Sequence, residues 1–325
     1  MNNFKKIGLT ALAASLVSTS VFAGELTATG SASLAFEGYS GSTLQSDSKF
    51  SMADSVTLSG STELDNGMTV TMAFELDGDA EATSSTSAYD DNSLTISSDA
   101  MGTLKFSAHG GSSASSALDG TAAGDMWDNF DTLVTGGSAT KAAGAGENSF
   151  YYTLPSMVDG LSVNASLNTA GTTGNNAVGY NATYSGVEGL SISYGFADIE
   201  SGTATTTGEQ TAMKASYAYG PVTVAYSNSE FDVGTAANEA SEQEVSSYSV
   251  SYTVSDAISL TYGTETIESG LASEVTDAEY EGITASYTAG GMTITAKRQE
   301  GDNISHVTST ADNYDYWSLG LSFAF

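Results

Sequence analysis

The sequence predicts an all-β fold, a transmembrane antiparallel barrel of about sixteen strands, and three observations predict it. Apolar and polar residues alternate with a period of two along most of the chain, which is typical of strands with one apolar and one polar face. Tight turns alternate with longer, polar loops between these segments. The chain also ends on such a segment, and a barrel must pair its last strand with its first.

The carboxyl-terminal segment carries the clearest alternation. From Trp317 to Phe325 every odd position is apolar and large, whereas the positions between them are small or polar. Free chain ends usually fray unless they are held in place. An aromatic end on an amphipathic strand is therefore expected where the strand closes a barrel and turns its apolar face to lipid.

Residues 1–23 have the layout of a secretory signal peptide. Lys5 and Lys6 precede a weakly apolar run that ends in Ala23, and a small residue at that place suits cleavage. A membrane-anchor helix is the alternative, but the run is short and is interrupted by Thr and Ser residues. The predicted organisation is a signal peptide over residues 1–23 and a single barrel over residues 24–325.

The remaining strands follow the same rule in order. Glu25–Phe36 opens the mature chain. Val56–Leu64 and Met68–Leu76 flank Asp65-Asn66-Gly67, where Asn-Gly tolerates the positive φ of a tight hairpin turn. Six later pairs of strands are centred on the turns at Asp99–Gly102, Pro155–Gly160, Gly186–Gly189, Gly220-Pro221, Ser255-Asp256 and Gly290-Gly291. Short turns at one end and long loops at the other are typical of barrels in the bacterial outer membrane.

Composition excludes several classes of protein. Eight basic residues stand against 39 acidic ones, for a net charge of −31, and nucleic-acid binding needs a basic face. Disorder is the usual alternative for an acidic chain, but 17 Tyr, 12 Phe and the sustained alternation predict an ordered fold. The chain has no cysteine, so no disulfide holds the fold together.

A soluble protein of two β-sandwich domains is the competing fold. Its strands would bury their apolar faces against each other, and a Pro- or Gly-rich linker should mark the domain boundary. The sequence shows no such boundary, and its tyrosines concentrate near strand ends, as in the aromatic belt of a membrane protein. The barrel is therefore the preferred fold.

Several short landmarks recur in a characteristic order and spacing. They are the signal sequence Lys-Lys-Ile-Gly-Leu-Thr-Ala-Leu-Ala, the opening Gly24–Leu34, Gly102-Thr103-Leu104, Asn148–Tyr152 and the terminal Leu321–Phe325. In these features the chain resembles the general porins of Gram-negative bacteria, in particular the trimeric porins of proteobacteria. The resemblance implies a sixteen-stranded barrel in the cell outer membrane, a homotrimer, and one loop folded inward to narrow each channel.

The polar faces of the strands predict a water-filled channel. They carry mainly Ser, Thr, Asn, Gly and Ala, which are too small to fill a barrel of this circumference. The charged residues with the parity of the polar face are Glu63, Glu75, Lys105, Lys214 and Lys297.

The longest connection, His109–Asn148, is the expected constriction loop. In Gly124–Val134 the period changes to that of an amphipathic helix. We expect its apolar face to anchor the loop on the barrel wall, mainly through Trp127 and Phe130, and its acidic face to point into the pore. A solvated helix on the outside of the barrel is the alternative. The acidic residues assigned to the constriction are Asp119, Asp125, Asp128 and Asp131.

These charges predict a channel that prefers cations. General porins commonly place arginines opposite the acidic loop, but Arg298 is the only arginine here and has outward parity. A predominantly negative lumen should concentrate cations and repel anions, more strongly at low salt. The predicted function is passive diffusion of ions and small hydrophilic solutes through an outer-membrane porin.

Three alternative functions are weighed against diffusion. A sugar-selective channel would need aromatic residues along the lumen, and only Tyr151, Tyr314 and Tyr316 have inward parity among the aromatics considered. An enzyme is not expected, because His109 and His306 are the only histidines and no nucleophile elbow surrounds a serine. A surface adhesin or receptor barrel would use its long loops instead.

Acid-rich connections suggest one further kind of partner. No cofactor is expected, but these connections could bind Ca²⁺ or Mg²⁺ through carboxylate oxygens, between chains or with anionic lipopolysaccharide. Solvated loop charge is the simpler interpretation, since no stretch has the spacing of an EF-hand. The connections are Asp77–Asp91, Glu230–Glu244 and Glu265–Glu281.

Overall fold

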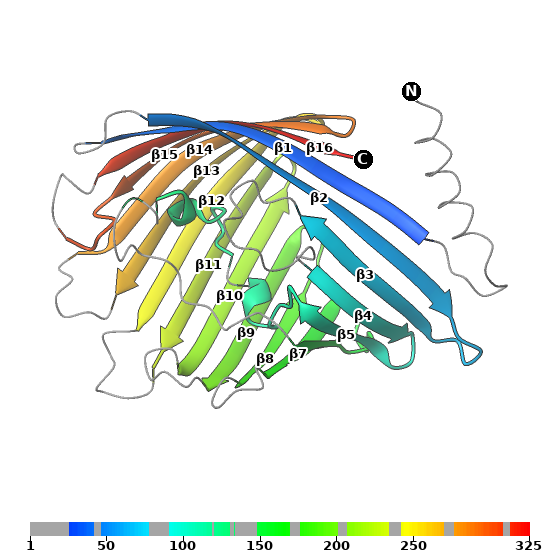
Figure 1. Ribbon diagram of the computed structural model, residues 1–325. Coiled ribbons are helices and arrows are strands. Elements are labelled where there is room, and N and C mark those ends of the chain that lie inside the picture. The colour runs from blue at the N-terminus through cyan, green and yellow to red at the C-terminus, as the bar shows by residue number, and fades with distance from the viewer. Residues whose placement is uncertain are drawn as a thin grey trace, which may run out of the picture.

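Sixteen antiparallel strands follow one another around a closed barrel in the computed structural model (Figure 1). The structure describes residues 26–41, 47–77, 91–118, 120–130, 133, 148–169, 176–200, 207–233, 242–269, 276–307 and 313–325. The strands are β1 Leu26–Gly41, β2 Asp47–Glu63, β3 Thr69–Asp77, β4 Asp91–Ser98, β5 Gly102–His109, β6 Ser149–Thr153, β7 Leu161–Thr169, β8 Asn176–Tyr184, β9 Leu190–Glu200, β10 Gly208–Tyr219, β11 Val222–Asp232, β12 Gln243–Ser255, β13 Ile258–Ser269, β14 Ala278–Ala289, β15 Met292–Asp302 and β16 Tyr314–Ala324. The predicted fold class is confirmed, and the two-domain sandwich is excluded, because β1 pairs with β16.

The connections alternate as the sequence predicted. Tight turns join β2 to β3, β4 to β5 and every second pair after them, whereas longer connections lie at the opposite end of the barrel. Gly220 and Gly290 have φ values of 57° and 61° in two of the tight turns, a conformation that glycine adopts without steric cost. Among the described residues, no helix has the length and the apolar character needed to cross a bilayer.

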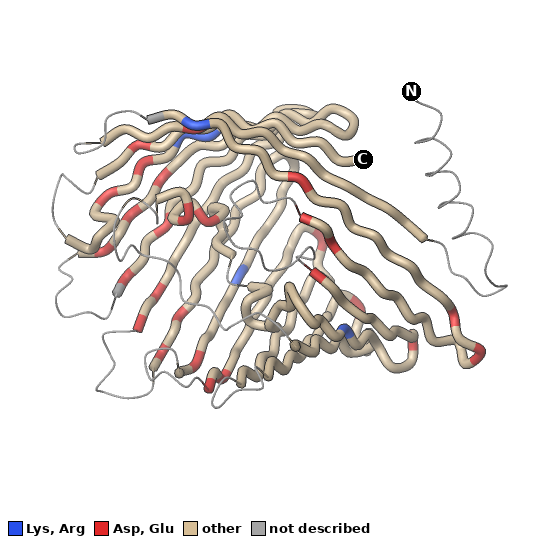
Figure 2. The backbone as a smooth tube through the Cα atoms, viewed as in Figure 1, with Lys and Arg blue, Asp and Glu red and all other residues tan. Residues whose placement is uncertain are grey.

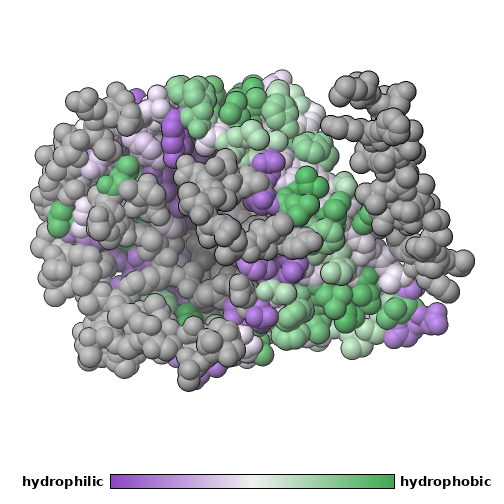
Figure 3. All heavy atoms as spheres, viewed as in Figure 1, coloured by the Kyte–Doolittle hydropathy of each residue, from purple (hydrophilic) through white to green (hydrophobic). Residues whose placement is uncertain are grey.

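The two faces of each strand differ in chemistry. On β12, Tyr248 and Val250 are exposed on the outside, whereas Ser247 and Ser249 are buried on the inside. The same alternation leaves many large apolar side chains exposed on the outer surface, and Figure 3 shows hydrophobic residues gathered over the part of the molecule where β2 to β5 lie. In water such a surface would be unfavourable. In a bilayer it meets apolar lipid tails.

Strand lengths vary around the barrel. β1 and β2 have 16 and 17 residues, and they extend further toward the loop end than the predicted segments Glu25–Phe36 and Val56–Leu64. β3 to β6 have nine, eight, eight and five residues. The extensions of β1 and β2 bring two charged residues, Glu37 and Lys49, into the barrel wall.

Aromatic rings cover glycines where the barrel closes. A Cβ atom on Gly38 of β1 would lie 2.8 Å from ring atoms of Trp317 on β16. Gly30 exchanges two backbone hydrogen bonds with Phe325, at 2.8 and 2.9 Å. The missing side chains therefore let bulky residues of the last strand lie against the first.

Candidate functional site

Residues 110–130, called here the inner segment, leave β5 and run inside the barrel (Figure 1). The segment contains two 3-10 turns, η1 Ser116–Leu118 and η2 Met126–Asn129. Its contacts with the inward faces of strands from β7 to β16 follow in chain order. This is the part of the connection His109–Asn148 that the structure describes, apart from Asn148 itself and Leu133.

The first part of the inner segment contacts β7 and β8. The backbone N–H of Ala114 donates to Oγ of Ser166 at 2.7 Å. Nδ2 of Asn181 donates to the carbonyl oxygen of Ala114 at 2.5 Å. Two wall side chains thus satisfy both polar groups of one buried peptide unit, which would otherwise be costly.

The middle of the inner segment crosses β11 and β12. The N–H of Ala122 donates to Oγ of Ser227 at 2.8 Å, and the N–H of Ala123 donates to Oγ of Ser247 at 3.0 Å. Small wall residues with a hydroxyl group therefore hold the backbone close to the sheet.

A buried carboxylate on β13 holds the next turn. Glu265 is 1% exposed, and its Oε2 accepts a hydrogen bond from the N–H of Trp127 at 3.1 Å. The hydroxyl of Thr121 donates to Oε1 of the same carboxylate. Thr121 and Asp125 are also joined, because the N–H of Thr121 donates to Oδ1 of Asp125 at 2.8 Å and the N–H of Asp125 donates to Oγ1 of Thr121 at 2.7 Å.

The last described part of the inner segment packs into an apolar cluster. Met126 and Phe130 are 2% and 0% exposed, and the ring of Phe130 lies 5.5 Å from that of Tyr280 and 6.2 Å from that of Tyr316, between centroids. Trp127 is partly buried against this cluster. Phe130 and Trp127 therefore contact the wall from within the barrel.

The predicted helix over Gly124–Val134 is wrong for the residues that the structure describes. In place of an α-helix there is the single turn η2. Asp125 precedes it with a φ of 52° and makes no side-chain cap to it. The N–H of Trp127 is directed to the wall, so the segment follows the wall rather than an internal helical ladder.

The four acidic residues assigned to the constriction have different surroundings. Asp128 is exposed. Asp125 is half-buried, and one of its oxygens accepts the hydrogen bond from Thr121, so it is also part of the segment's own structure. Asp119 and Asp131 lie outside the described residues.

The structure does not bring the predicted lumen charges together at one place. Lys105, Lys214 and Lys297 lie on β5, β10 and β15. Glu63 ends β2 at the turn end of the barrel. Glu75 on β3 stands directly opposite Asp91 on β4, so two carboxylates share one stretch of the inner wall.

Lys214 is the lysine that lies nearest to the inner segment. A Cβ atom on Gly120 would lie 3.7 Å from Nζ of Lys214 and 3.5 Å from Oδ2 of Asp125. A cation from the wall and a carboxylate of the inner segment therefore border the same glycine.

Sequence reasoning missed three charged residues of the inner wall. Nζ of Lys49 lies 3.2 Å from Oε1 of Glu37, and the hydroxyl of Tyr316 donates to Oε2 of Glu37 at 2.7 Å. Glu265 was assigned to an acid-rich connection, yet β13 extends to Ser269. Its parity with the small residue Gly263 was the signal that could have placed it on the inner face.

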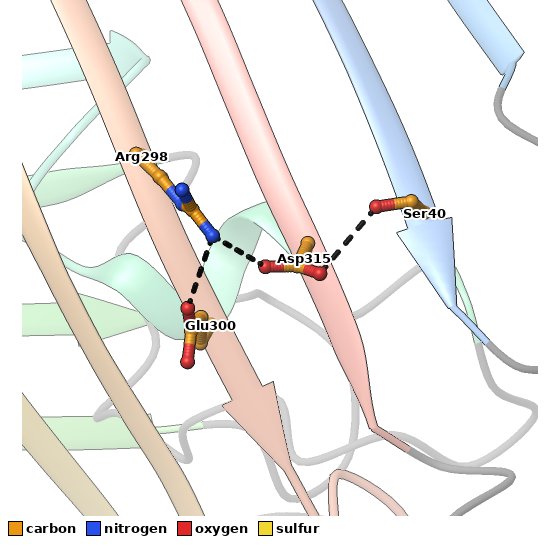
Figure 4. Close-up of polar contacts among 4 residues, drawn as sticks. All are labelled: Ser40, Arg298, Glu300 and Asp315. Carbon is orange, nitrogen blue, oxygen red and sulfur yellow. Dashed lines mark hydrogen bonds and ion pairs between the residues drawn. The ribbon is translucent and has the colours of Figure 1, made fainter.

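The outer face carries most of the other charge. Acidic residues gather toward the loop end of β9 to β15 (Figure 2). Arg298 has the outward position that its parity predicted, and its guanidinium lies 3.4 Å from Glu300 and 3.5 Å from Asp315, which accepts a hydrogen bond from Ser40 (Figure 4). Glu230 and Glu244, assigned to a connection, are in fact paired strand residues of β11 and β12.

A search for clustered metal ligands concerns the proposed divalent ions. In the part of the chain that the structure describes, no group of three or more His, Cys, Asp or Glu residues is placed to hold a metal ion. The two histidines lie apart in sequence position, with His109 ending β5 and His306 following β15. His306 is buried, and its Nδ1 lies 3.3 Å from the carbonyl oxygen of Thr276.

Comparison with known proteins agrees with this geometry. A sequence model of Gram-negative porins matches residues 8–325. The fold is similar to that of an anion-selective porin from Comamonas acidovorans, with 14% identity and a TM-score of 0.69 over 93% of this chain and 100% of that one. It is also similar to a mutant porin of Rh. blastica, with 16% identity and a TM-score of 0.64 over the same shares. No curated protein sequence matches significantly. Because the family model spans nearly the whole sequence, the chain belongs to the Gram-negative porin family, whose fold and membership point to an outer-membrane channel rather than an enzyme.

Proposed function

We propose that this porin passes ions and small hydrophilic solutes by passive diffusion and prefers cations. The observation that carries the proposal is negative charge on both sides of the lumen. Asp128 is exposed on the inner segment. Glu75 and Asp91 form an opposed pair on β3 and β4, strands that do not carry the inner segment. A pore bordered by carboxylates from two directions lowers the energy of cations and raises that of anions.

The lysines of the wall offset this charge only in part. Lys49 lies beside Glu37, and Lys214 lies near Asp125. Both ammonium groups therefore have a carboxylate close by. Lys105 and Lys297 are on opposite parts of the strand order, so no clustered lysine site for anions is formed by the described wall.

Planar-bilayer recordings test the preference directly. With purified protein in a gradient of KCl, the reversal potential should have the sign of a potassium-selective channel, and the selectivity should weaken as the salt concentration rises. A reversal potential of the chloride sign would overturn the proposal. The Comamonas porin is described as anion-selective, so the selectivity of this chain rests on its own charges.

General diffusion is favoured over a sugar-selective channel by the inward tyrosines. Tyr314 and Tyr316 are 7% and 3% exposed and belong to the cluster under the inner segment. They therefore present little ring surface to a passing sugar. Flux of neutral sugars in loaded liposomes should fall smoothly with sugar size and show no saturation.

We also propose that the protein is a homotrimer, as the family suggests. Two observations on the described outer surface support it. The strands β3 to β6 are short, and Asp54 is the one outward carboxylate of β1 to β8, whereas β9 to β15 carry many (Figure 2). An arc without charge suits contact with another copy. Conductance steps that close in threes would support the trimer, and single independent steps would contradict it.

Divalent cations between the acidic outer rim and lipopolysaccharide form the last part of the proposal. Glu230 stands opposite Glu244, which stands opposite Glu268, and like charges directly opposite each other destabilise a sheet. Ca²⁺ or Mg²⁺ would relieve that repulsion and contact lipid phosphates. Removing divalent ions with EDTA should lower the thermal stability of the protein in lipopolysaccharide, but not in a neutral detergent.

A further inference from the structure

Several glycines of the inner wall lie directly beneath the inner segment. Glycine within a strand weakens it and usually marks a place where another backbone approaches closely. Five inward glycines on β8, β9, β13, β14 and β15 meet the inner segment in the order of the chain: Gly179, Gly195, Gly263, Gly282 and Gly301.

The space above these glycines is filled by the inner segment itself. A Cβ atom on Gly195 would lie 3.0 Å from Cδ1 of Leu118. On Gly263 it would lie 2.5 Å from Cβ of Ala123. Contacts under 3.0 Å require movement, because ordinary carbon contacts lie near 3.5–4.0 Å.

The same relationship extends to the end of the described segment. A Cβ atom on Gly282 would lie 3.1 Å from Sδ of Met126, and one on Gly301 would lie 3.1 Å from the ring of Phe130. Gly320 on β16 is different, since the one atom near its Cβ position is the carbonyl oxygen of Thr295, at 3.8 Å.

Hydroxyl side chains continue this track on the strands between the glycines. Ser227 and Ser247, on β11 and β12, accept hydrogen bonds from consecutive residues of the inner segment. Gly263 stands directly opposite Gly282 in the sheet. The wall under the inner segment is thus built from glycines that leave room for it and serines that bind its backbone.

We propose that these inward glycines form a seat that sets the bore of the channel, by letting the inner segment lie flat against the wall. The proposal rests on the proposed function, because it assumes that the barrel conducts. A methyl group in the seat would lift the segment toward the lumen, and at Gly263 the required shift is about 1 Å, from 2.5 Å to an ordinary carbon contact. Single glycines of the wall are therefore positioning residues for permeation.

The test compares Gly263→Ala with Gly320→Ala in planar bilayers at one salt concentration. Gly263→Ala should lower the single-channel conductance by roughly a fifth or more, since the segment narrows the pore. Gly320→Ala, an equal change on the same inner face without the segment above it, should leave conductance unchanged. Equal conductance of the two variants would overturn the seat. A wild-type protein without conductance would instead contradict the proposed function.

A compensating change makes the inference specific. The contact at Gly263 is with Cβ of Ala123, so the double variant Gly263→Ala/Ala123→Gly removes the methyl group that the new one meets. Its conductance should return toward that of the wild type, and a simple sum of the two single effects would contradict the proposal. If Gly263→Ala does not fold, Gly195→Ala serves instead. It meets only the movable end of Leu118, and unchanged conductance there would also count against the seat.

Discussion

The backbone N–H of Trp127 donates to Oε2 of Glu265 at 3.1 Å, across 138 positions of sequence. This hydrogen bond joins the inner segment to a wall strand at a carboxylate that is 1% exposed. Because the hydroxyl of Thr121 donates to the same carboxylate, one wall residue fixes both ends of the turn that precedes η2. The position of the exposed Asp128 beside the lumen follows from that anchorage.

Replacing Glu265 by alanine should loosen the inner segment without opening the barrel. The change leaves the N–H of Trp127 and the hydroxyl of Thr121 without their acceptor, and each buried unsatisfied group costs about 1–3 kcal/mol. We expect larger open-channel current noise and more frequent brief closures in bilayer recordings. Glu63→Ala is the matched control, since it removes an exposed carboxylate of the polar strand faces at the turn end. Equal noise in both variants would mean that Glu265 does not hold the segment.

Neutralising the wall carboxylates should weaken the preference for cations. In the double variant Glu75→Gln/Asp91→Asn, the wall that faces away from the inner segment loses two charges that stand opposite each other. The reversal potential in a KCl gradient should move toward zero, and addition of Asp128→Asn should move it further. The control is Glu279→Gln/Asp302→Asn, an opposed and exposed pair on the outer face. An equal shift in the control would assign the selectivity to overall charge rather than to the lumen.

Removing the ring of Phe130 should destabilise the inner segment more than the barrel. Phe130 is 0% exposed and packs against Tyr280 and Tyr316, and truncation of a buried Phe costs about 3–5 kcal/mol. We expect faster cleavage of the inner segment by a protease, measured as fragments on a gel, while the amount of β-structure by circular dichroism stays the same. Phe50→Ala, at an outward position that is 72% exposed, should leave the cleavage rate unchanged. A cleavage rate of Phe130→Ala equal to that of the wild type would contradict the packing role.

The faces of the strands were predictable because alternation is a local property. Ser247 and Tyr248 differ in polarity, and their neighbours along β12 repeat the difference. A closed barrel then needs only that each strand pairs with the next, so strand order also followed from the chain. The ends of β1 and β2 were less predictable, because Glu37 and Lys49 continue the ladder through pairing with each other rather than through an apolar pattern.

The conformation of the inner segment could not be predicted from its own residues. Its apolar side chains recur with a helical period because one side faces a wall and the other faces the lumen, which is also the environment of an amphipathic helix. The choice between the two depended on acceptors far away in sequence, such as Glu265 and Ser247. Local periodicity reports which side of a segment is buried and does not report where its backbone hydrogen bonds go.

Adding a methyl group at Gly38 should weaken the closure of the barrel. Its Cβ would lie 2.8 Å from the ring of Trp317, and Trp317 also packs edge-on against Phe36, with centroids 4.9 Å apart. The ring would have to leave the seam between the first and the last strand, where the sheet has the least support from sequence neighbours. The midpoint of thermal unfolding of Gly38→Ala in detergent, followed by circular dichroism, should therefore fall by several degrees. Gly60→Ala on β2 is the control, because its Cβ position has no atom within 4 Å, and it should unfold at the wild-type temperature. If both variants unfold together, the aromatic cover at the seam contributes nothing to closure.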